Sequence, residues 1–336
     1  MPTIFPLFAV SFCHIVASRS FGRDANRQKT KRILASIGAK KETKGMKINI
    51  FIVLFFLKTF WVSAQTKGVV LDENNLPIPY VNIWVEGENI GTTSEENGTF
   101  IIDSNDGNKN LIFNILGFEK KIIKLSEAKK VVLQSLTNEL NEIVIVNKKE
   151  TKEIEIGQVE NAILQAFENG PKIDVKYFPY NPKYKSTRYI KQVRILTDSK
   201  LETATLKIHF YAVDENGLPG EKLLKKDFIV TIKKGGRNNK INVSKFNLAI
   251  PKTGIFVGFE KLMIESNKEE KTITDPNTKA TKIQRTYYPL LLYNYIDRDF
   301  IYTFSGGKWI KETAETKGIT TKIDAYQPAI NLILTN

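Results

Sequence analysis

Short runs of apolar residues alternate with polar turn formers from residue 67 onward. Val81, Ile83 and Val85 stand at every second position, just before a turn that contains glycine. Alternation with a period of two places one face of a strand in a core. Between residues 66 and 147 the pattern predicts strands at 69–71, 81–85, 100–102, 111–115, 120–125, 131–133 and 142–146. This many short strands, separated by turns, predict an antiparallel β-sandwich.

The next segment, 148–186, opens with a charged stretch that has the composition of a linker. Within it, Val159, Ile163 and Phe167 stand at helical spacing, and a Gly-Pro pair follows. The spacing predicts a short amphipathic helix over 157–169 that ends at the Gly-Pro pair.

Beyond Thr187 the pattern returns to strands, which we predict at 189–196, 204–213, 228–232, 240–243, 255–264, 281–288, 300–304, 308–310 and 329–334. The segments between them contain residues typical of tight turns, among them Asn216-Gly217 and Gly306-Gly307. Nine strands predict a second, larger sandwich of the jelly-roll kind over residues 187–336. The predicted fold class is all-β, with two β-sandwich domains joined by a linker and a short helix.

Residues 46–64 have the three parts of a secretory signal peptide. Lys47 supplies the charge, an apolar stretch covers 50–57, and Val62 and Ala64 fit the small-residue positions before a cleavage site. The apolar stretch is shorter than the roughly 20 residues of a spanning helix. We therefore expect cleavage after Ala64, export through the inner membrane to the periplasm or cell surface, and no stable transmembrane segment in the mature chain.

Residues 1–45 precede this signal and contain a second apolar run, 4–17, followed by a basic stretch. This order is the reverse of a signal peptide. We interpret residues 1–45 as an upstream extension and Met46 as the initiator. The alternative is a first membrane segment with a cytoplasmic basic loop.

Basic residues are concentrated in this leader. The 336 residues carry 50 Lys and Arg against 36 Asp and Glu, a formal charge of +14. Residues 1–64 hold eleven of the basic residues and two of the acids, which leaves 39 basic and 34 acidic residues in 65–336. So small an excess argues against nucleic acid as a partner.

Cysteine and histidine are scarce, with one and two copies, and Cys13 and His14 lie in the leader. A disulfide framework and a Cys/His zinc site are therefore excluded. His209 stands inside a predicted strand, where we expect a satisfied or surface histidine. The sequence has no G-x-S-x-G and no phosphate-loop motif. We assign no catalytic, cofactor-binding or metal-binding residue, and no cofactor.

Several short motifs occur in order between residues 68 and 118. They are Gly68-x-Val70-x-Asp72, Leu76-Pro77-x-Pro79-x-Val81-x-Ile83, Gly91-Thr92-Thr93-Ser94, Gly98-x-Phe100-x-Ile102 and Gly117-Phe118. With these motifs, residues 66–147 resemble the carboxypeptidase-regulatory-like domain, a transthyretin-like β-sandwich. This domain is common in exported Bacteroidetes proteins, including the N-terminal extensions of TonB-dependent receptors. Residues 206–259 are similar to jelly-roll domains that follow it in uncharacterised Bacteroidetes proteins.

The resemblance implies the accessory sandwich of certain metallocarboxypeptidases without their zinc ligands. Such a peptidase needs several His and Glu ligands, whereas His209 fits neither H-x-x-E nor H-E-x-x-H. Peptidase chemistry of that class is excluded. A glycoside hydrolase with paired carboxylates stays open, because two of the many acids could meet in the fold.

Aromatic residues form a group late in the sequence. Our candidate ligand-stacking residues are Tyr287, Tyr288, Tyr293, Tyr295 and Trp309. Exposed rings on a jelly roll can stack on sugar rings. The alternative is that these rings fill the core and the contact between the domains.

Together these features predict an exported, non-enzymatic cell-envelope protein that acts through binding or assembly. Its expected partner is an envelope protein or a glycan. One alternative is a carbohydrate-binding accessory protein of a glycan-uptake system that uses the second sandwich. The other is a glycoside hydrolase with acidic catalysts.

Overall fold

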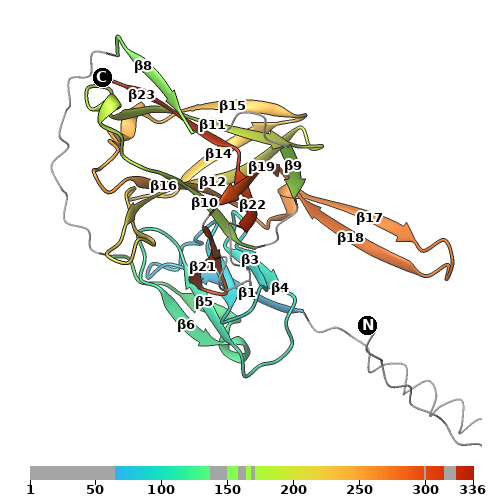
Figure 1. Cartoon of the computed structure of the whole chain (residues 1–336). Helices are drawn as coiled ribbons and strands as arrows, with labels where there is room; N and C mark the ends of the chain where they lie inside the picture. The colour runs from blue at the N-terminus through green and yellow to red at the C-terminus, as the bar shows by residue number, and fades with distance from the viewer. Residues whose placement is uncertain (1–64, 137–149, 158–163, 168–170, 299, 314–322) are drawn as a thin grey trace, which may run out of the picture. The chain divides into compact units, whose positions relative to one another are not determined.

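The computed structural model describes residues 65–136, 150–157, 164–167, 171–298, 300–313 and 323–336 (Figure 1). Within these ranges the regular structure is almost entirely β-strand. The helical elements there are short 3₁₀ turns, namely η1 (Leu125–Glu127), η2 (Pro182–Tyr184), η3 (Ser244–Phe246) and η4 (Glu265–Asn267). The predicted all-β fold with two sandwiches is confirmed. The leader and the strand predicted at 142–146 lie outside the described residues.

The N-terminal sandwich consists of two sheets. The first has the order β4 (Thr99–Ile102), β1 (Thr66–Leu71) and β7 (Lys130–Val132). The second has the order β3 (Gly91–Thr93), β2 (Asn82–Val85), β5 (Asn110–Asn114) and β6 (Lys121–Lys124). Phe100 from the first sheet and Phe113 from the second meet in the core, with ring centroids 5.6 Å apart.

Strand β2 is buried on both of its faces, although it belongs to a two-layer sandwich. Ile83 and Val85 point into the core of the N-terminal sandwich. Asn82 and Trp84 alternate with them and therefore occupy the opposite face. Their burial means that a further layer of the protein covers this outer face.

The larger sandwich consists of two seven-stranded sheets, named here after their central strands. The β12 sheet has the order β13 (Pro219–Lys222), β12 (Thr203–Val213), β16 (Ile255–Lys261), β10 (Ile173–Phe178), β20 (Phe300–Ser305) and β21 (Lys308–Thr313), and β14 (Phe228–Lys233) also pairs with β12. The β11 sheet has the order β22 (Ile323–Pro328), β19 (Leu290–Arg298), β11 (Tyr189–Asp198), β23 (Ile330–Thr335) and β8 (Glu153–Ile156), with β15 (Arg237–Asn242) on β11 and β9 (Leu164–Phe167) on β19.

The two faces of β12 have different partners. Leu206, Ile208 and Phe210 lie in the core between the β12 and β11 sheets. Lys207 and His209 alternate with them on the other face, and both are buried. The N-terminal sandwich covers this face, as described below for Tyr80 and Trp84.

Trp84 of the N-terminal sandwich belongs to an apolar cluster on the outer face of the β12 sheet, together with Tyr211, Phe256 and Tyr302. Its indole Nε1 donates a hydrogen bond of 3.0 Å to the carbonyl oxygen of Pro171. The described residues from 65 onward belong to one compact unit. The two sandwiches therefore share an interface.

The segment 148–186 differs from the expected linker with a short helix. Its residues 153–156, 164–167 and 173–178 are strands β8, β9 and β10, and all three pair within the sheets of the larger sandwich. The helix prediction is wrong at 164–167, and residues 158–163 and 168–170 lie outside the described part. A short apolar run satisfies helical and strand patterns equally, and here pairing with β19 selects the strand.

Strands β17 (Lys268–Thr274) and β18 (Thr281–Tyr287) form a separate two-stranded sheet. This hairpin, orange in Figure 1, extends away from the sandwiches. Most of its residues are exposed, and its partly buried positions gather at the end where Lys268 pairs with Tyr287.

Candidate functional site

The five predicted ligand-stacking residues do not form one surface. Tyr288 and Tyr293 are only 2% and 3% exposed, which removes both from an exposed stacking platform. The Tyr293 hydroxyl donates a 2.8 Å hydrogen bond to Asp174 inside the larger sandwich. Burial, together with the charge of Glu269, raises the pKa of Tyr288 to about 12. These two rings follow the alternative considered above, in which late aromatic residues fill the core.

The other three candidates lie in different places. Tyr287 is at the base of the β17–β18 hairpin. The backbone of Tyr295 pairs with Tyr326 of β22, and its side chain is outside the described part. Trp309 lines a cleft of about 700 Å³ between the two sandwiches. We call this space the inter-sandwich cleft.

Aromatic side chains of the β12 sheet form one wall of the inter-sandwich cleft. Phe304 and Trp309 are directly opposite each other on β20 and β21, with ring centroids 5.2 Å apart. Tyr211 of β12 packs edge-on against Trp309 at 5.3 Å. The tight turn Gly306-Gly307, with φ of +58° and +87°, connects β20 and β21, and glycine adopts such angles without strain.

Two asparagines of the N-terminal sandwich also line the cleft. Asn82 of β2 and Asn114 of β5 are directly opposite each other in the strand register, so their side chains lie on the same face. Asn82 is only 2% exposed, and no group among the described residues donates a hydrogen bond to its Oδ1. An unsatisfied buried acceptor costs about 1–3 kcal/mol.

Beside the cleft, the two sandwiches are joined by a buried charge. The Nζ of Lys207, whose side chain is fully buried, lies 2.6 Å from Asp227 Oδ2. The same Nζ donates a 2.6 Å hydrogen bond to the carbonyl oxygen of Tyr80 in the N-terminal sandwich. One lysine on β12 thus fixes the adjacent sandwich through a backbone oxygen.

His209 lies next to this ion pair and is paired with Glu260 of β16. Its Nε2 is 2.7 Å from Glu260 Oε2, and both side chains are buried. Burial and the charge of Lys222 lower the pKa of His209, although Glu260 opposes the shift. Burial would raise the pKa of Glu260, but the hydrogen bond from His209 and the charge of Lys207 lower it overall. A neutral imidazole therefore donates Nε2–H to a carboxylate, as expected for a satisfied histidine.

Lys222 lines the inter-sandwich cleft and also interacts with the buried carboxylates of Asp227 and Glu260. Burial lowers its pKa, and the charges of Asp227 and Glu260 oppose that shift. Its Nζ is 3.9 Å from Asp227 Oδ1. Lys225 also lines the cleft, from an exposed position. The cleft therefore combines an aromatic wall, two amides, two ammonium groups and the carboxylate of Glu221.

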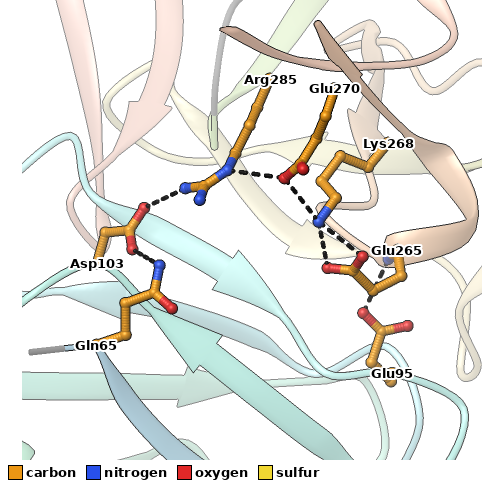
Figure 2. A network of polar contacts seen from close by, with 7 residues as sticks. All are labelled: Gln65, Glu95, Asp103, Glu265, Lys268, Glu270 and Arg285. Carbon is orange, nitrogen blue, oxygen red and sulfur yellow. Dashed lines mark hydrogen bonds and ion pairs between the residues drawn. The ribbon is translucent and has the colours of Figure 1, made fainter. Parts of the chain in front are cut away.

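A second polar network joins the N-terminal sandwich to the base of the hairpin (Figure 2). Arg285 of β18 contacts Asp103 Oδ2 at 3.3 Å and Glu270 Oε1 at 3.0 Å. Asp103 in turn accepts a 2.7 Å hydrogen bond from Gln65. These side chains are largely exposed, and exposed ion pairs contribute little to stability.

Lys268 and Glu95 complete this network at its more buried end. The Nζ of Lys268 lies 2.7 Å from Glu265 and 3.2 Å from Glu270. Burial opposes the charge of Lys268, but its bonds to Glu265 and Glu270 raise its pKa. Burial raises the pKa of Glu95, against the hydrogen bond it accepts from the backbone of Glu265. The network surrounds a small pocket of about 240 Å³. Because its side chains bond to one another, we interpret it as a structural contact that holds the hairpin base to the N-terminal sandwich.

Neither group of interface residues was predicted from the sequence. Asn82, Asn114, Lys207 and Asp227 fill no specified position of a motif, and each stands in or beside an ordinary strand pattern. One signal was present on β12, where Lys207 and His209 interrupt a long apolar strand at alternate positions. That pattern indicates that the second face of β12 is also buried, but it does not indicate which part of the protein covers that face.

The described part of the chain contains neither a metal-binding cluster nor a membrane-spanning helix. In that part, no group of three or more His, Cys, Asp or Glu side chains is arranged to hold a metal ion. Among the same residues, no helix is both long and apolar enough to span a membrane.

Comparisons with known proteins identify a family for the N-terminal sandwich. Residues 66–145 match the model of the CarboxypepD_reg-like domain family, as the resemblance had implied. The chain is 36% identical over 137 residues to TonB-dependent receptor P3 of Formosa agariphila, a match that covers 38% of this chain and 14% of the receptor. TonB-dependent receptor P39 of the same bacterium is 23% identical over 113 residues, which cover 32% of this chain and 11% of the receptor. The chain therefore spans only a small part of the length of these relatives.

Among solved structures, the cysteine protease and lectin-like domains of Cwp84, a surface layer associated protein of Clostridium difficile, are 13% identical to this chain. The alignment covers 77% of this chain and 59% of that one, with a TM-score of 0.33.

Proposed function

We propose that this chain is a non-enzymatic, exported protein of the cell envelope that acts by binding, through the inter-sandwich cleft. The observation that carries the proposal is the cleft itself, because residues of both sandwiches line it and neither sandwich could form it alone. Its volume of about 700 Å³ falls in the range of ligand-binding clefts, roughly 300–1,000 Å³.

Three further features support this function. The match to the CarboxypepD_reg-like family and the similarity to two TonB-dependent receptors favour the cell envelope as the site of action. The signal peptide predicted at 46–64 provides the route of export. His209, the sole histidine after the leader, is held in a pair with Glu260 and is not available to activate a nucleophile.

Cell fractionation tests the location. The full chain, expressed in a Bacteroidetes host, is expected in the periplasmic or outer-membrane fraction with Gln65 at its N-terminus. Recovery from the cytoplasm with residues 1–64 still attached would contradict export.

Site-specific photo-cross-linking in cells tests binding through the cleft. A photoreactive amino acid at Leu136, which lines the cleft and is 46% exposed, is expected to give a covalent adduct. The matched control is the same substitution at Leu76, which is 60% exposed and does not line the cleft. Equal labelling at both positions, or none at Leu136, would overturn a binding role for the cleft.

A further inference from the structure

The β17–β18 hairpin exposes apolar side chains beside free strand edges. Ile273 on β17 is 46% exposed, and Ile283 on β18 is 58% exposed. No described strand pairs with the outer edge of either strand, and the register between them is continuous, without a bulge. A two-stranded hairpin alone is at best marginally stable in water, and an added strand stabilises it. The hairpin is therefore suited to pairing with another strand.

The hydrogen bonds within the hairpin determine which backbone groups of β17 face outward. The N–H of Asp275 donates a 2.9 Å hydrogen bond to the carbonyl oxygen of Ala280, across the hairpin. In an antiparallel pair, residues bonded in this way alternate with residues whose N–H and C=O point away from the partner strand. Ile273 therefore bonds across the hairpin like Asp275, whereas Thr272 and Thr274 direct their backbone groups to the free edge.

A second copy of β17 fits this edge when a two-fold axis passes through Ile273. Thr272 then lies opposite Thr274 of the second copy, so the outward N–H and C=O groups bond to one another. Ile273 lies opposite Ile273 of the second copy, and Lys271 lies opposite Asp275 on both sides of the axis. An isologous dimer requires a self-complementary surface of this kind.

Neighbouring registers are less well matched. A two-fold axis through Thr272 would place Ile273 opposite Lys271, and an axis through Thr274 would place it opposite Asp275. Either arrangement sets an apolar side chain against a charge. Lysine on an edge strand usually discourages pairing, but Lys271 faces an opposite charge when the axis passes through Ile273.

The edge of β18 lacks this complementarity. From Thr281 to Tyr287 it carries two basic residues, Lys282 and Arg285, and no acidic residue. A second copy of β18 would therefore offer no opposite charge to Lys282. Charge matching favours β17 as the edge that pairs.

We propose that this chain forms a two-fold homodimer in which the β17 strands of two copies pair, with Ile273 at the axis. The two hairpins then make one four-stranded sheet. Lys271, whose side chain is 54% exposed and 3.4 Å from Glu269, gains a second acidic neighbour in Asp275 of the other copy. Paired segments this short bury less area than a standard interface, so the dimer is weak, with a dissociation constant of roughly 10–100 μM. The inference goes beyond the proposed function and does not involve the inter-sandwich cleft.

Disulfide trapping in the purified full chain tests the pairing. Cys13→Ser removes the sole native thiol, and Ile273→Cys places a new one at the proposed axis. Opposite residues in a non-hydrogen-bonded pair have Cα atoms about 4.5 Å apart, within the range that a disulfide spans. Under mild oxidation we expect a covalent dimer of Ile273→Cys to form at least about tenfold faster than one of Ile283→Cys. Ile283→Cys is the matched control, since it is also exposed on the hairpin. Equal rates, or a faster reaction at Ile283→Cys, would overturn the proposal.

Sedimentation equilibrium tests the same edge without a covalent bond. Thr272→Pro removes an outward N–H from β17 but leaves the bonds within the hairpin in place, and should weaken the dimer at least about tenfold. Ile283 lies opposite Thr272 and also faces outward, so Ile283→Pro is the matched change on β18 and should leave the dimer intact. A wild-type chain that stays monomeric up to about 500 μM would overturn the proposal. Equal weakening by both prolines, or assembly beyond a dimer, would also contradict it, because either result would mean that β18 pairs too.

Discussion

At the scale of single residues, the interface between the sandwiches depends on charges that are almost wholly removed from water. Lys207 is fully buried, and its ammonium group is neutralised by Asp227 and bound by the carbonyl of Tyr80. Removing one member of such a pair leaves the other buried and unpaired, which costs far more than an exposed pair is worth. The prediction of a satisfied histidine at His209 is confirmed, and its partner Glu260 could not be foreseen because it lies 51 positions away.

Replacing Asp227 with asparagine should therefore be strongly destabilising. Asp227→Asn keeps the shape but leaves Lys207 with an uncompensated charge, and we expect a loss of about 3–5 kcal/mol in the free energy of unfolding. Chemical denaturation measures it. Asp198→Asn, at an exposed position, is the matched control and should change stability by less than about 0.5 kcal/mol. A loss of similar size in both variants would contradict the assigned role of Asp227.

His209 should make stability depend on pH in a defined direction. Its pKa is lowered in the folded state, so below its unfolded value of about 6.5 the unfolded chain binds a proton that the folded chain does not. Stability should therefore fall as the pH decreases through about 6.5. In His209→Gln, which still donates to Glu260, this part of the dependence should disappear. Unfolding free energies measured between about pH 7.5 and 5 test this, and equal slopes in both proteins would refute it.

At the scale of elements, strands with clear alternation were predicted well, and strands without it were missed. The strands predicted at 204–213 and 255–264 correspond to β12 and β16, whose observed ends differ from the predicted ones by at most a few residues. Strand β8 was taken as part of a linker because Glu153–Ile156 is short and half charged. Its pairing with β23 is a contact between positions about half the chain apart, and no local pattern carries that information.

The β17–β18 hairpin should be nearly independent of the rest of the fold. Its outer residues are exposed, and its base is fixed by exposed ion pairs around Arg285. Replacing residues 272–283 with an Asn-Gly turn should change the free energy of unfolding by no more than about 1 kcal/mol.

A contrasting variant calibrates this measurement. Tyr288→Ala, at the buried base of the hairpin, should cost about 3–5 kcal/mol. If shortening the hairpin destabilises the protein as much as Tyr288→Ala does, the hairpin packs against the fold more closely than its exposure indicates.

At the scale of the whole described unit, the two sandwiches should unfold together because their interface is buried and well packed. Trp84 is 2% exposed, packs against Phe304 with ring centroids 5.0 Å apart, and reaches Pro171 through its indole nitrogen. The sequence predicted each sandwich from its own alternation. It could not predict their contact, because the covered faces of β2 and β12 are recognisable only when both sheets are in place.

Trp84→Ala should weaken this coupling. We expect a loss of about 3–5 kcal/mol and a thermal transition that separates into two steps, followed by differential scanning calorimetry. Leu76→Ala, at a position 60% exposed, should keep one transition near the wild-type temperature. A single transition in Trp84→Ala would mean that other contacts suffice to couple the sandwiches.

The place of β23 in the β11 sheet also limits when the larger sandwich can form. β23 lies between β11 and β8, so its residues Ile330–Thr335 must be present before either neighbour gains its full set of hydrogen bonds. During synthesis, β8 and β11 leave the ribosome long before β23 does. The largest core of the protein therefore cannot close on a nascent chain until Ile330–Thr335 has been synthesised.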